Sequence, residues 1–121
     1  MTPEELWNRY SAIWSSTPEK RKTELEACLA DNATYCDPNG PLAGRDALSD
    51  YMGGFQKSVP GGSFRILQVV AHNGRSLSRW ALQGADGETM QLGVSFATHD
   101  EAGRLRAISG FFPLAGTGTE R

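Results

Sequence analysis

Asp37 is the residue whose surroundings in the sequence point most directly to acid–base chemistry. It stands in the segment YCDPNGPLAGR (residues 35–45), between a short apolar run and a turn rich in Pro, Asn and Gly. The ring of Pro38 clashes with a helical conformation of the residue before it, so the backbone at Asp37 is expected to be extended. The carboxylate could accept N–H groups of the turn, or it could face a pocket and accept a proton from a substrate. The sequence leaves both interpretations open.

Large aromatic residues elsewhere in the chain could form the wall of such a pocket. The candidates are Trp14, Tyr35, Phe55 and Trp80. In an apolar pocket the charged form of Asp37 would be poorly solvated, which would make this carboxylate a better base. Tyr10 and Trp14 lie four residues apart on a predicted helix, a spacing that is more common in a hydrophobic core than in a ligand site. Their polar ends need partners if they are buried, and a ligand could supply them.

Three helices are expected in the first half of the chain. The segment TPEE (residues 2–5) has the Thr cap, the Pro and the Glu that are typical of a helix start. Thr17-Pro18 repeats this signal and predicts a second helix that ends near residues 31–32. Asp46 predicts the start of a third helix, although two glycines weaken the prediction for its C-terminal half.

The second half of the chain has the alternating pattern of strands. Residues 33–36 predict a short strand that leads into Asp37, and from residue 62 onward the apolar period changes to two. The predicted strands are Ser63–His72, Arg75–Gln83, Thr89–Thr98 and a last strand that contains Phe111 and Phe112. Helices on one side of an antiparallel meander predict an α+β fold, with residues 1–113 as a single domain and residues 114–121 as a flexible tail.

The strand predicted at Thr89–Thr98 carries no charge on either face. One face has Met90, Leu92, Val94 and Phe96, and the other has Gln91, Gly93, Ser95 and Ala97. Three short helices can cover only one face of a sheet, so a second subunit is expected to cover part of the other. The sequence therefore predicts a homodimer.

Composition excludes several classes of protein. The net charge is −2, with 12 basic and 14 acidic residues, so no basic field is available for nucleic acid or for an anionic membrane. No apolar stretch is long enough to span a bilayer, and the N-terminus is acidic where a signal peptide would be basic. Cys28 and Cys36 have no metal-ligand spacing and are expected to be free thiols of a soluble cytoplasmic protein. We find no sequence pattern for a metal or another cofactor.

The order of elements and the segment around Asp37 resemble the nuclear transport factor 2-like superfamily, and within it the SnoaL-like and ketosteroid isomerase-like branch. That branch often has an aromatic residue, an acid, Pro, Gly and Gly-Arg before a helix. In this chain the matching residues are Tyr35, Asp37, Pro38, Gly40, Gly44 and Arg45. The resemblance implies a cone-shaped barrel in which N-terminal helices pack on a curved, mainly antiparallel sheet.

The resemblance also implies roles for particular residues. In the isomerases that this chain resembles, the matching aspartate moves a proton beside a carbonyl, while a tyrosine of the first helix and a protonated acid on the sheet stabilise the enolate oxygen. Asp37 matches the base and Tyr10 the tyrosine, with Trp14 as an alternative donor. The second acid has no counterpart here, because its position falls near Ser95.

The function expected from the sequence is therefore that of a pocket protein for a small hydrophobic molecule. As an enzyme it would be an isomerase or cyclase without a cofactor, acting on a polyketide-, steroid- or terpenoid-like carbonyl compound. Trp14, Tyr35, Phe55, Trp80 and Ser95 would contact the substrate. The alternative is a ligand-binding or dimeric interaction module without chemistry. His72 and His99 stand beside turns and are expected at the surface, although dehydratases of the same superfamily use histidine in catalysis.

Overall fold

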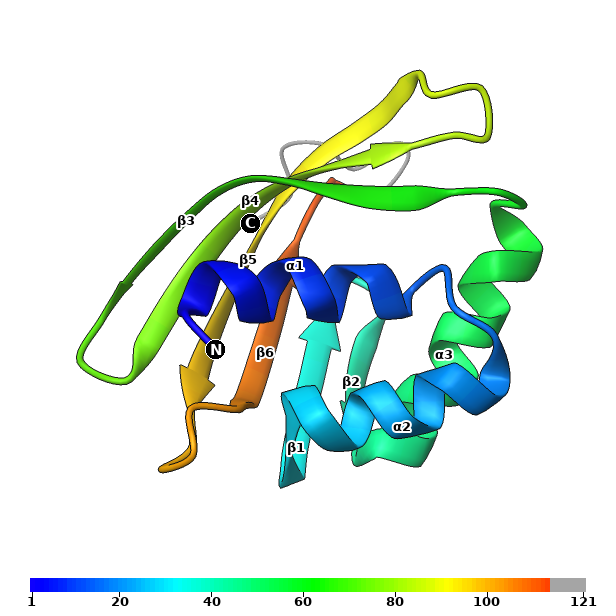
Figure 1. Ribbon diagram of the computed structural model, residues 1–121. Helices are drawn as coiled ribbons and strands as arrows, with labels where there is room; N and C mark the ends of the chain where they lie inside the picture. Colours follow the sequence, from blue (N-terminus) through cyan, green and yellow to red (C-terminus); the bar gives the residue numbers. More distant parts are fainter. Residues whose placement is uncertain (114–121) are drawn as a thin grey trace.

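The computed structural model describes residues 1–113 as three helices and six strands (Figure 1). The elements follow the order α1 (Pro3–Ile13), α2 (Pro18–Cys28), β1 (Leu29–Asp37), β2 (Gly40–Ala43), α3 (Arg45–Ser58), β3 (Ser63–His72), β4 (Arg75–Gln83), β5 (Thr89–His99) and β6 (Leu105–Phe111). The tail predicted at residues 114–121 lies outside the described residues. Among the described helices, none has the length and apolarity needed to cross a membrane.

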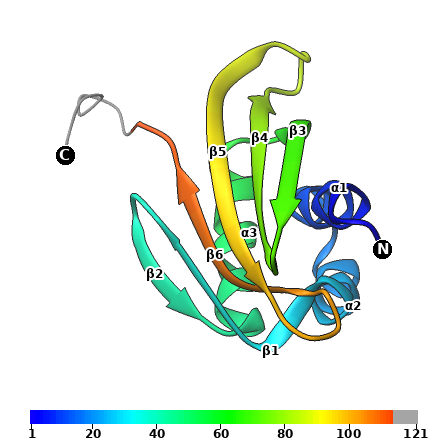
Figure 2. The same cartoon turned by 90° about the vertical axis from the view of Figure 1, so that its left-hand side faces the viewer.

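The six strands form one curved sheet in the order β2-β1-β6-β5-β4-β3. Neighbouring strands pair antiparallel except β1 and β6, which pair parallel. The sheet is open, with β2 and β3 at its edges, and all three helices lie on its concave side (Figures 1 and 2). The predicted α+β class, with helices packed on a curved and mainly antiparallel sheet, is confirmed.

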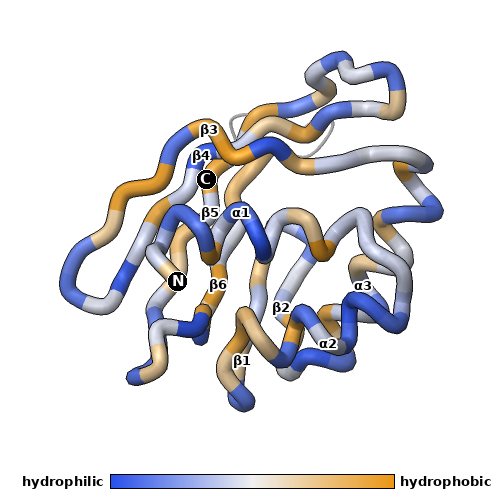
Figure 3. The backbone as a smooth tube through the Cα atoms, in the orientation of Figure 1, coloured by the Kyte–Doolittle hydropathy of each residue, from blue (hydrophilic) through white to orange (hydrophobic). Residues whose placement is uncertain are grey.

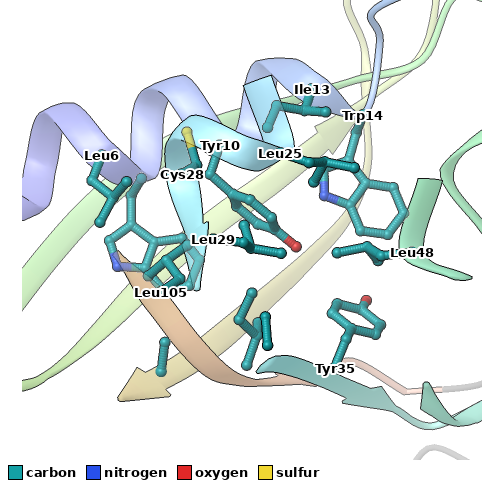
Figure 4. Packing of buried hydrophobic residues seen from close by; sticks show 14 of the residues in the cluster. Leu6, Tyr10, Ile13, Trp14, Leu25, Cys28, Leu29, Tyr35, Leu48 and Leu105 are labelled. Atoms are coloured by element: carbon teal, nitrogen blue, oxygen red, sulfur yellow. The ribbon is translucent and has the colours of Figure 1, made fainter. Parts of the chain in front are cut away.

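The start of the first helix follows the sequence signal closely. The Thr2 hydroxyl accepts the N–H of Glu5, and the Glu5 carboxylate accepts the N–H of Thr2, so each satisfies a donor that the helix end would leave free. This start places Leu6, Tyr10 and Ile13 in the core, where they are almost completely buried (Figure 4).

Several boundaries differ from the predictions. β5 extends to His99, and β6 ends at Phe111, so Phe112 lies outside the last strand. The second helix ends at Cys28 and not near residues 31–32, because β1 begins at Leu29 and is longer than the predicted residues 33–36. The third helix begins at Arg45 after Gly44, and continues through its two glycines to Ser58. The segment Gly40–Ala43, which the sequence predicted as part of a turn, pairs with the end of β1 as a strand.

The two faces of the sheet have different surroundings. The concave face packs against the helices and carries the core, while several large apolar side chains remain exposed on the chain, including Val70, Leu92 and Phe111. The tips of the β3–β4 and β4–β5 hairpins are hydrophilic (blue in Figure 3), with Asn73 and Gly74 in the positive-φ conformation of a tight turn at the first tip. The concave face is therefore the place to look for a site.

Candidate active site

A cavity of about 510 Å³ lies between α1, α3 and the concave face of the sheet. Every residue that the sequence predicted for the site lines this cavity: Tyr10, Trp14, Tyr35, Asp37, Phe55, Trp80 and Ser95. The fold thus brings together residues from two helices and three strands that lie far apart in the chain. Their roles in binding or catalysis stay predictions.

Asp37 is the buried acid of the cavity. It ends β1, and only 7% of its surface is exposed. Its Oδ1 accepts the backbone N–H of Asn39 at 2.8 Å, while its Oδ2 accepts the hydroxyl groups of Tyr35 at 2.8 Å and Tyr51 at 2.7 Å. One oxygen of this carboxylate therefore caps the turn and the other accepts two phenols, while the residue lines the cavity. Its role as a base stays a prediction.

Tyr51 and Asn39 complete this network and were missed in the sequence analysis as site residues. The Asn39 side-chain amide donates to the Tyr51 hydroxyl at 2.9 Å, and that hydroxyl in turn donates to Asp37. The position of Tyr51 on the apolar face of α3 is the pattern of a core residue, and only the packing of α3 against the end of β1 shows its second function. A tyrosine on a helix that follows the Asp-Pro turn is the signal that could have indicated it.

The Tyr10 hydroxyl is a buried donor without a partner. Tyr10 is 4% exposed, and its Oη makes no hydrogen bond of standard geometry within residues 1–113. Figure 4 shows this hydroxyl pointing away from Leu6, toward the part of the core that holds Trp14 and Tyr35. A buried hydroxyl without a partner costs free energy, so this donor is free for an acceptor atom of a ligand in the cavity.

The phenols around Asp37 are held in the neutral form. Burial raises the pKa of Tyr10 and of Tyr35 well above the ordinary value of a tyrosine, and the nearby Asp37 carboxylate acts in the same direction. The same two causes, burial first and the hydrogen bond to Asp37 second, raise the pKa of Tyr51 to about 12. At neutral pH all three groups are therefore hydrogen-bond donors.

Ser95 occupies the place near which the resemblance expected a second acid. Its Oγ accepts the indole N–H of Trp80 at 3.0 Å, so its own proton is left to donate. The Trp80 indole lies against Gly93 of the neighbouring strand, where a Cβ atom would come within 2.3 Å of the ring. Gly93 therefore leaves the space that Trp80 needs in the cavity wall.

Gly110 lies between Asp37 and Ser95 on β6, the strand that separates β1 from β5. A Cβ atom at Gly110 would be 3.6 Å from Asp37 Cβ, 3.6 Å from Ser95 Oγ and 3.7 Å from the Tyr35 hydroxyl. These three side chains thus surround a single point on the sheet. The absence of a side chain at Gly110 opens the space between the carboxylate and the serine.

The two histidines do not line the cavity. His72 is exposed, as predicted. His99 is half-buried, and its Nε2 lies 2.7 Å from the Ser76 hydroxyl, which accepts the indole N–H of Trp7 at 2.8 Å. Since His99 Nδ1 lies 2.8 Å from the carbonyl of Gly103, the ring is fixed at both nitrogens, and it serves to hold the end of β5 in place.

Both cysteines are free thiols, as the sequence predicted. Cys36 is exposed, whereas Cys28 is buried in the core, and burial raises the pKa of its thiol to about 11. Within the described part of the chain, no three or more His, Cys, Asp or Glu side chains come together as metal ligands.

A family model described as the SnoaL-like domain matches residues 7–108, which is most of the chain. This protein belongs to the SnoaL-like family. The matched residues include Tyr10, Asp37 and Ser95, so the site lies within the SnoaL-like domain. A comparison with curated proteins finds no match.

Solved structures share the fold of this SnoaL-like protein at low sequence identity. A protein of Agrobacterium tumefaciens named as an isomerase of the SnoaL-like family is 22% identical, with a TM-score of 0.86 over 94% of this chain and 100% of that chain. A Sinorhizobium meliloti protein named as a polyketide cyclase is 16% identical, with a TM-score of 0.69 over 88% and 93% of the two chains. A Kribbella flavida protein named as a ketosteroid isomerase is 19% identical, with a TM-score of 0.68 over 91% and 76%.

Proposed function

We propose that this SnoaL-like protein is an isomerase or cyclase that works without a cofactor on a small hydrophobic carbonyl compound. Its site would move a proton at the carbon next to the carbonyl group. The names of structural relatives, which include isomerase, polyketide cyclase and ketosteroid isomerase, support this class of reaction. A polyketide-, steroid- or terpenoid-like substrate would suit the aromatic walls of the cavity.

The observation that carries the proposal is the unpartnered hydroxyl of Tyr10 in the same cavity as the buried carboxylate of Asp37. Proton abstraction next to a carbonyl needs a base near the carbon and a donor near the oxygen, where negative charge develops. Tyr10 has a proton to donate and no acceptor among the described residues. A substrate carbonyl would give it that acceptor.

The hydrogen bonds of Asp37 indicate which atom would act as the base. A carboxylate has about four acceptor positions, two on each oxygen. Both positions of Oδ2 are taken by Tyr35 and Tyr51, whereas Oδ1 accepts, among residues 1–113, only the N–H of Asn39. Oδ1 therefore keeps one position for a substrate proton, while the two tyrosines and the turn fix the direction of the carboxylate.

In the proposed step, the C–H bond next to the carbonyl breaks and its proton goes to Oδ1 of Asp37. The electron pair of that bond forms a C=C bond, and the charge moves to the carbonyl oxygen, which accepts the Tyr10 hydrogen bond. In a ketone with a C=C bond between the β and γ carbons, return of the proton to the γ carbon would move that double bond next to the carbonyl and give the isomerised ketone. The Ser95 hydroxyl, on the other side of Gly110, is a second donor for a polar group of the substrate.

One observation favours a binding module without chemistry. Three of the four acceptor positions of Asp37 are already occupied, which is the arrangement of a carboxylate that organises a turn and a helix. In that case the cavity would hold a ligand through Tyr10 and Ser95, and Asp37 would only position the wall.

Proton exchange separates these two functions without knowledge of the natural substrate. The bicyclic ketone 2-tetralone, dissolved in D₂O, loses the NMR signals of the protons next to its carbonyl when a base removes them. We expect the protein to accelerate this loss above the buffer rate, and Asp37→Asn to abolish the acceleration. Tyr10→Phe should lower the rate by about 10²–10³-fold, the cost of losing one oxyanion donor.

Two controls separate catalysis from stability. Asp46→Asn removes an exposed carboxylate from the first turn of α3, outside the cavity, and should leave the exchange rate unchanged. Tyr10→Phe removes a buried hydroxyl that has no partner, so it should not lower the free energy of unfolding. Equal exchange rates for the parent protein, Asp37→Asn and buffer would contradict the proposed enzyme activity and favour the binding module.

The cellular setting is proposed from the thiols. Two free thiols, the exposed Cys36 and the buried Cys28, suit the reducing environment of the cytoplasm better than an oxidising compartment.

A further inference from the structure

The cavity contains acidic groups and no basic ones among its described lining residues. Asp37 and Asp50 line it, and no Lys, Arg or His of residues 1–113 does. Asp50 is exposed, whereas Asp37 is buried. A ligand that enters this cavity therefore meets negative charge and no positive side chain.

The buried carboxylate of Asp37 has no counter-ion in the described part of the chain. The ion pairs there join Arg9 to Glu24, Arg45 and Arg104 to Asp31, and Arg104 to Asp100. The three donors that reach Asp37 are two phenols and a peptide N–H, all of them neutral. They stabilise the carboxylate by hydrogen bonds, but none of them carries a charge that would balance it. Buried charges are ordinarily paired.

The wall of the cavity is built from the aromatic residues of the chain. All three tryptophans, all three tyrosines and three of the five phenylalanines line it. Trp14 is at the centre of this wall, with the rings of Tyr35, Tyr51, Phe55 and Phe64 at centroid distances of 5.5–5.9 Å. Aromatic faces attract cations, most strongly where water is excluded, and tryptophan does so best.

We infer that the cavity selects a positively charged organic ligand, a tertiary or quaternary ammonium compound. The unpaired carboxylate would supply the counter-charge, and the aromatic wall would contact the alkyl groups around the nitrogen. This inference deepens the proposed function and rests on it for the role of Asp37 as a base. Together the two make the substrate an amino ketone. The preference for a cation is argued separately, from the charges and the aromatic rings of the cavity.

A cationic substrate would also keep the site neutral throughout proton transfer. With a neutral ketone the site carries a charge of −1 before the step, on Asp37, and −1 after it, on the substrate oxygen. With a ketone that bears an ammonium group, the site is neutral before and after the transfer. Since pairing a buried charge is favourable, the cationic substrate would supply the counter-charge for Asp37. No basic side chain among the described lining residues of the cavity supplies it.

Two probes of the same shape test this inference: (3-hydroxyphenyl)trimethylammonium and 3-tert-butylphenol. They differ by one positive charge, and the quaternary nitrogen has no proton to transfer, so binding is separated from base chemistry. Isothermal titration calorimetry should give a dissociation constant at least about tenfold lower for the cation. Asp37→Asn should reduce this preference severalfold, while Asp46→Asn, outside the cavity, should leave it unchanged.

The parent protein alone can overturn the inference. Equal or tighter binding of 3-tert-butylphenol, or no binding of the cation at about 10 mM, would contradict a cation site. A preference that survives in Asp37→Asn would contradict the assignment to this carboxylate. If that variant does not fold, the ratio in the parent protein still decides. The outcome of this binding test is independent of the exchange test with neutral 2-tetralone. If the protein catalyses exchange but does not prefer the cation, its substrate is a neutral ketone. If it prefers the cation but does not catalyse exchange, it is a binding protein.

Discussion

The Trp80 indole fills the space that any side chain at Gly93 would need. The two residues are direct partners on β4 and β5, and a Cβ atom at Gly93 would lie 2.3 Å from the ring. The indole is in turn fixed by its hydrogen bond to Ser95, two residues farther along β5. This part of the cavity wall therefore depends on a glycine that lies outside the Asp-Pro turn.

Gly93→Ala is expected to displace the Trp80 ring and break its hydrogen bond to Ser95. Because a rigid indole cannot move without disturbing its neighbours, the free energy of unfolding should fall by about 1–3 kcal/mol, the usual cost of overpacking. Chemical denaturation measures this loss, and 2-tetralone exchange measures its effect on the site.

Gly110→Ala is the matched control, since its methyl group would meet nothing closer than 3.6 Å. We expect little change in stability there but slower exchange, because the methyl group fills the space between Asp37 and Ser95. Similar losses of stability in the two alanine variants would argue against the special role of Gly93.

The three tyrosines of the chain, Tyr10, Tyr35 and Tyr51, all line the cavity, so phenol ionisation reports on the site alone. In the unfolded chain they should ionise near pH 10. In the folded protein the pKa of each is raised, that of Tyr51 to about 12. Absorbance at 295 nm should therefore show no phenolate near pH 10 while the protein stays folded.

The same shifts predict the direction of the stability change. A group whose folded pKa lies above its unfolded value stabilises the protein fully below the unfolded value, and the contribution is lost as the pH rises through the folded value. The free energy of unfolding should therefore fall between about pH 10, where free tyrosine ionises, and the pKa of Tyr51 at about 12. Urea unfolding at increasing pH checks this, and a phenol that titrates near pH 10 in the folded state would contradict the burial of the site.

We propose that the convex face of the sheet joins two copies of the chain. Cross-strand pairing places Val70, Leu77 and Phe96 in one row and Val94 and Phe111 in the next. Phe111 is 59% exposed and Val70 51%, which is unfavourable for apolar side chains in water. Light scattering should give about twice the chain mass of 13.1 kDa.

A charge in this face should separate the copies. Phe111→Lys would place a charged group in the second row, whereas Ala12→Lys on the exposed side of α1 is the control on the opposite surface. The first variant should have the mass of a monomer and the second that of a dimer. A monomeric parent protein at micromolar concentration would refute the proposal.

Local sequence signals predicted much of this fold because each depends on nearby residues. The Thr cap, Pro and Glu at residues 2–5 act within one helical turn, and Asn73-Gly74 defines a hairpin by backbone conformation alone. The β2 strand was missed because its composition, with Gly40 and Pro41, is that of a turn. Its pairing with β1 depends on the neighbouring strand and not on its own residues.

The site shows the same division. Asp37 could be found from the Asp-Pro turn, and the aromatic wall from the abundance of large rings. The contacts of Asp37 with Tyr51 and its approach to Ser95 could not, because they depend on the packing of α3 and on the position of β6 between β1 and β5. Two interpretations that seemed exclusive in the sequence, cap and pocket acid, are compatible in space because a carboxylate has two oxygens.

The parallel pairing of β1 with β6 joins the two ends of the domain, and this has a consequence for synthesis on the ribosome. The chain emerges with its N-terminus first, so Asp37 and the rings of α1 leave the exit tunnel long before Gly110. Until β6 arrives, β1 lacks its inner neighbour and cannot join the β3–β5 part of the sheet. The site can therefore be completed only after Leu105–Phe111 has left the exit tunnel, however early Asp37 and the rings of α1 are made.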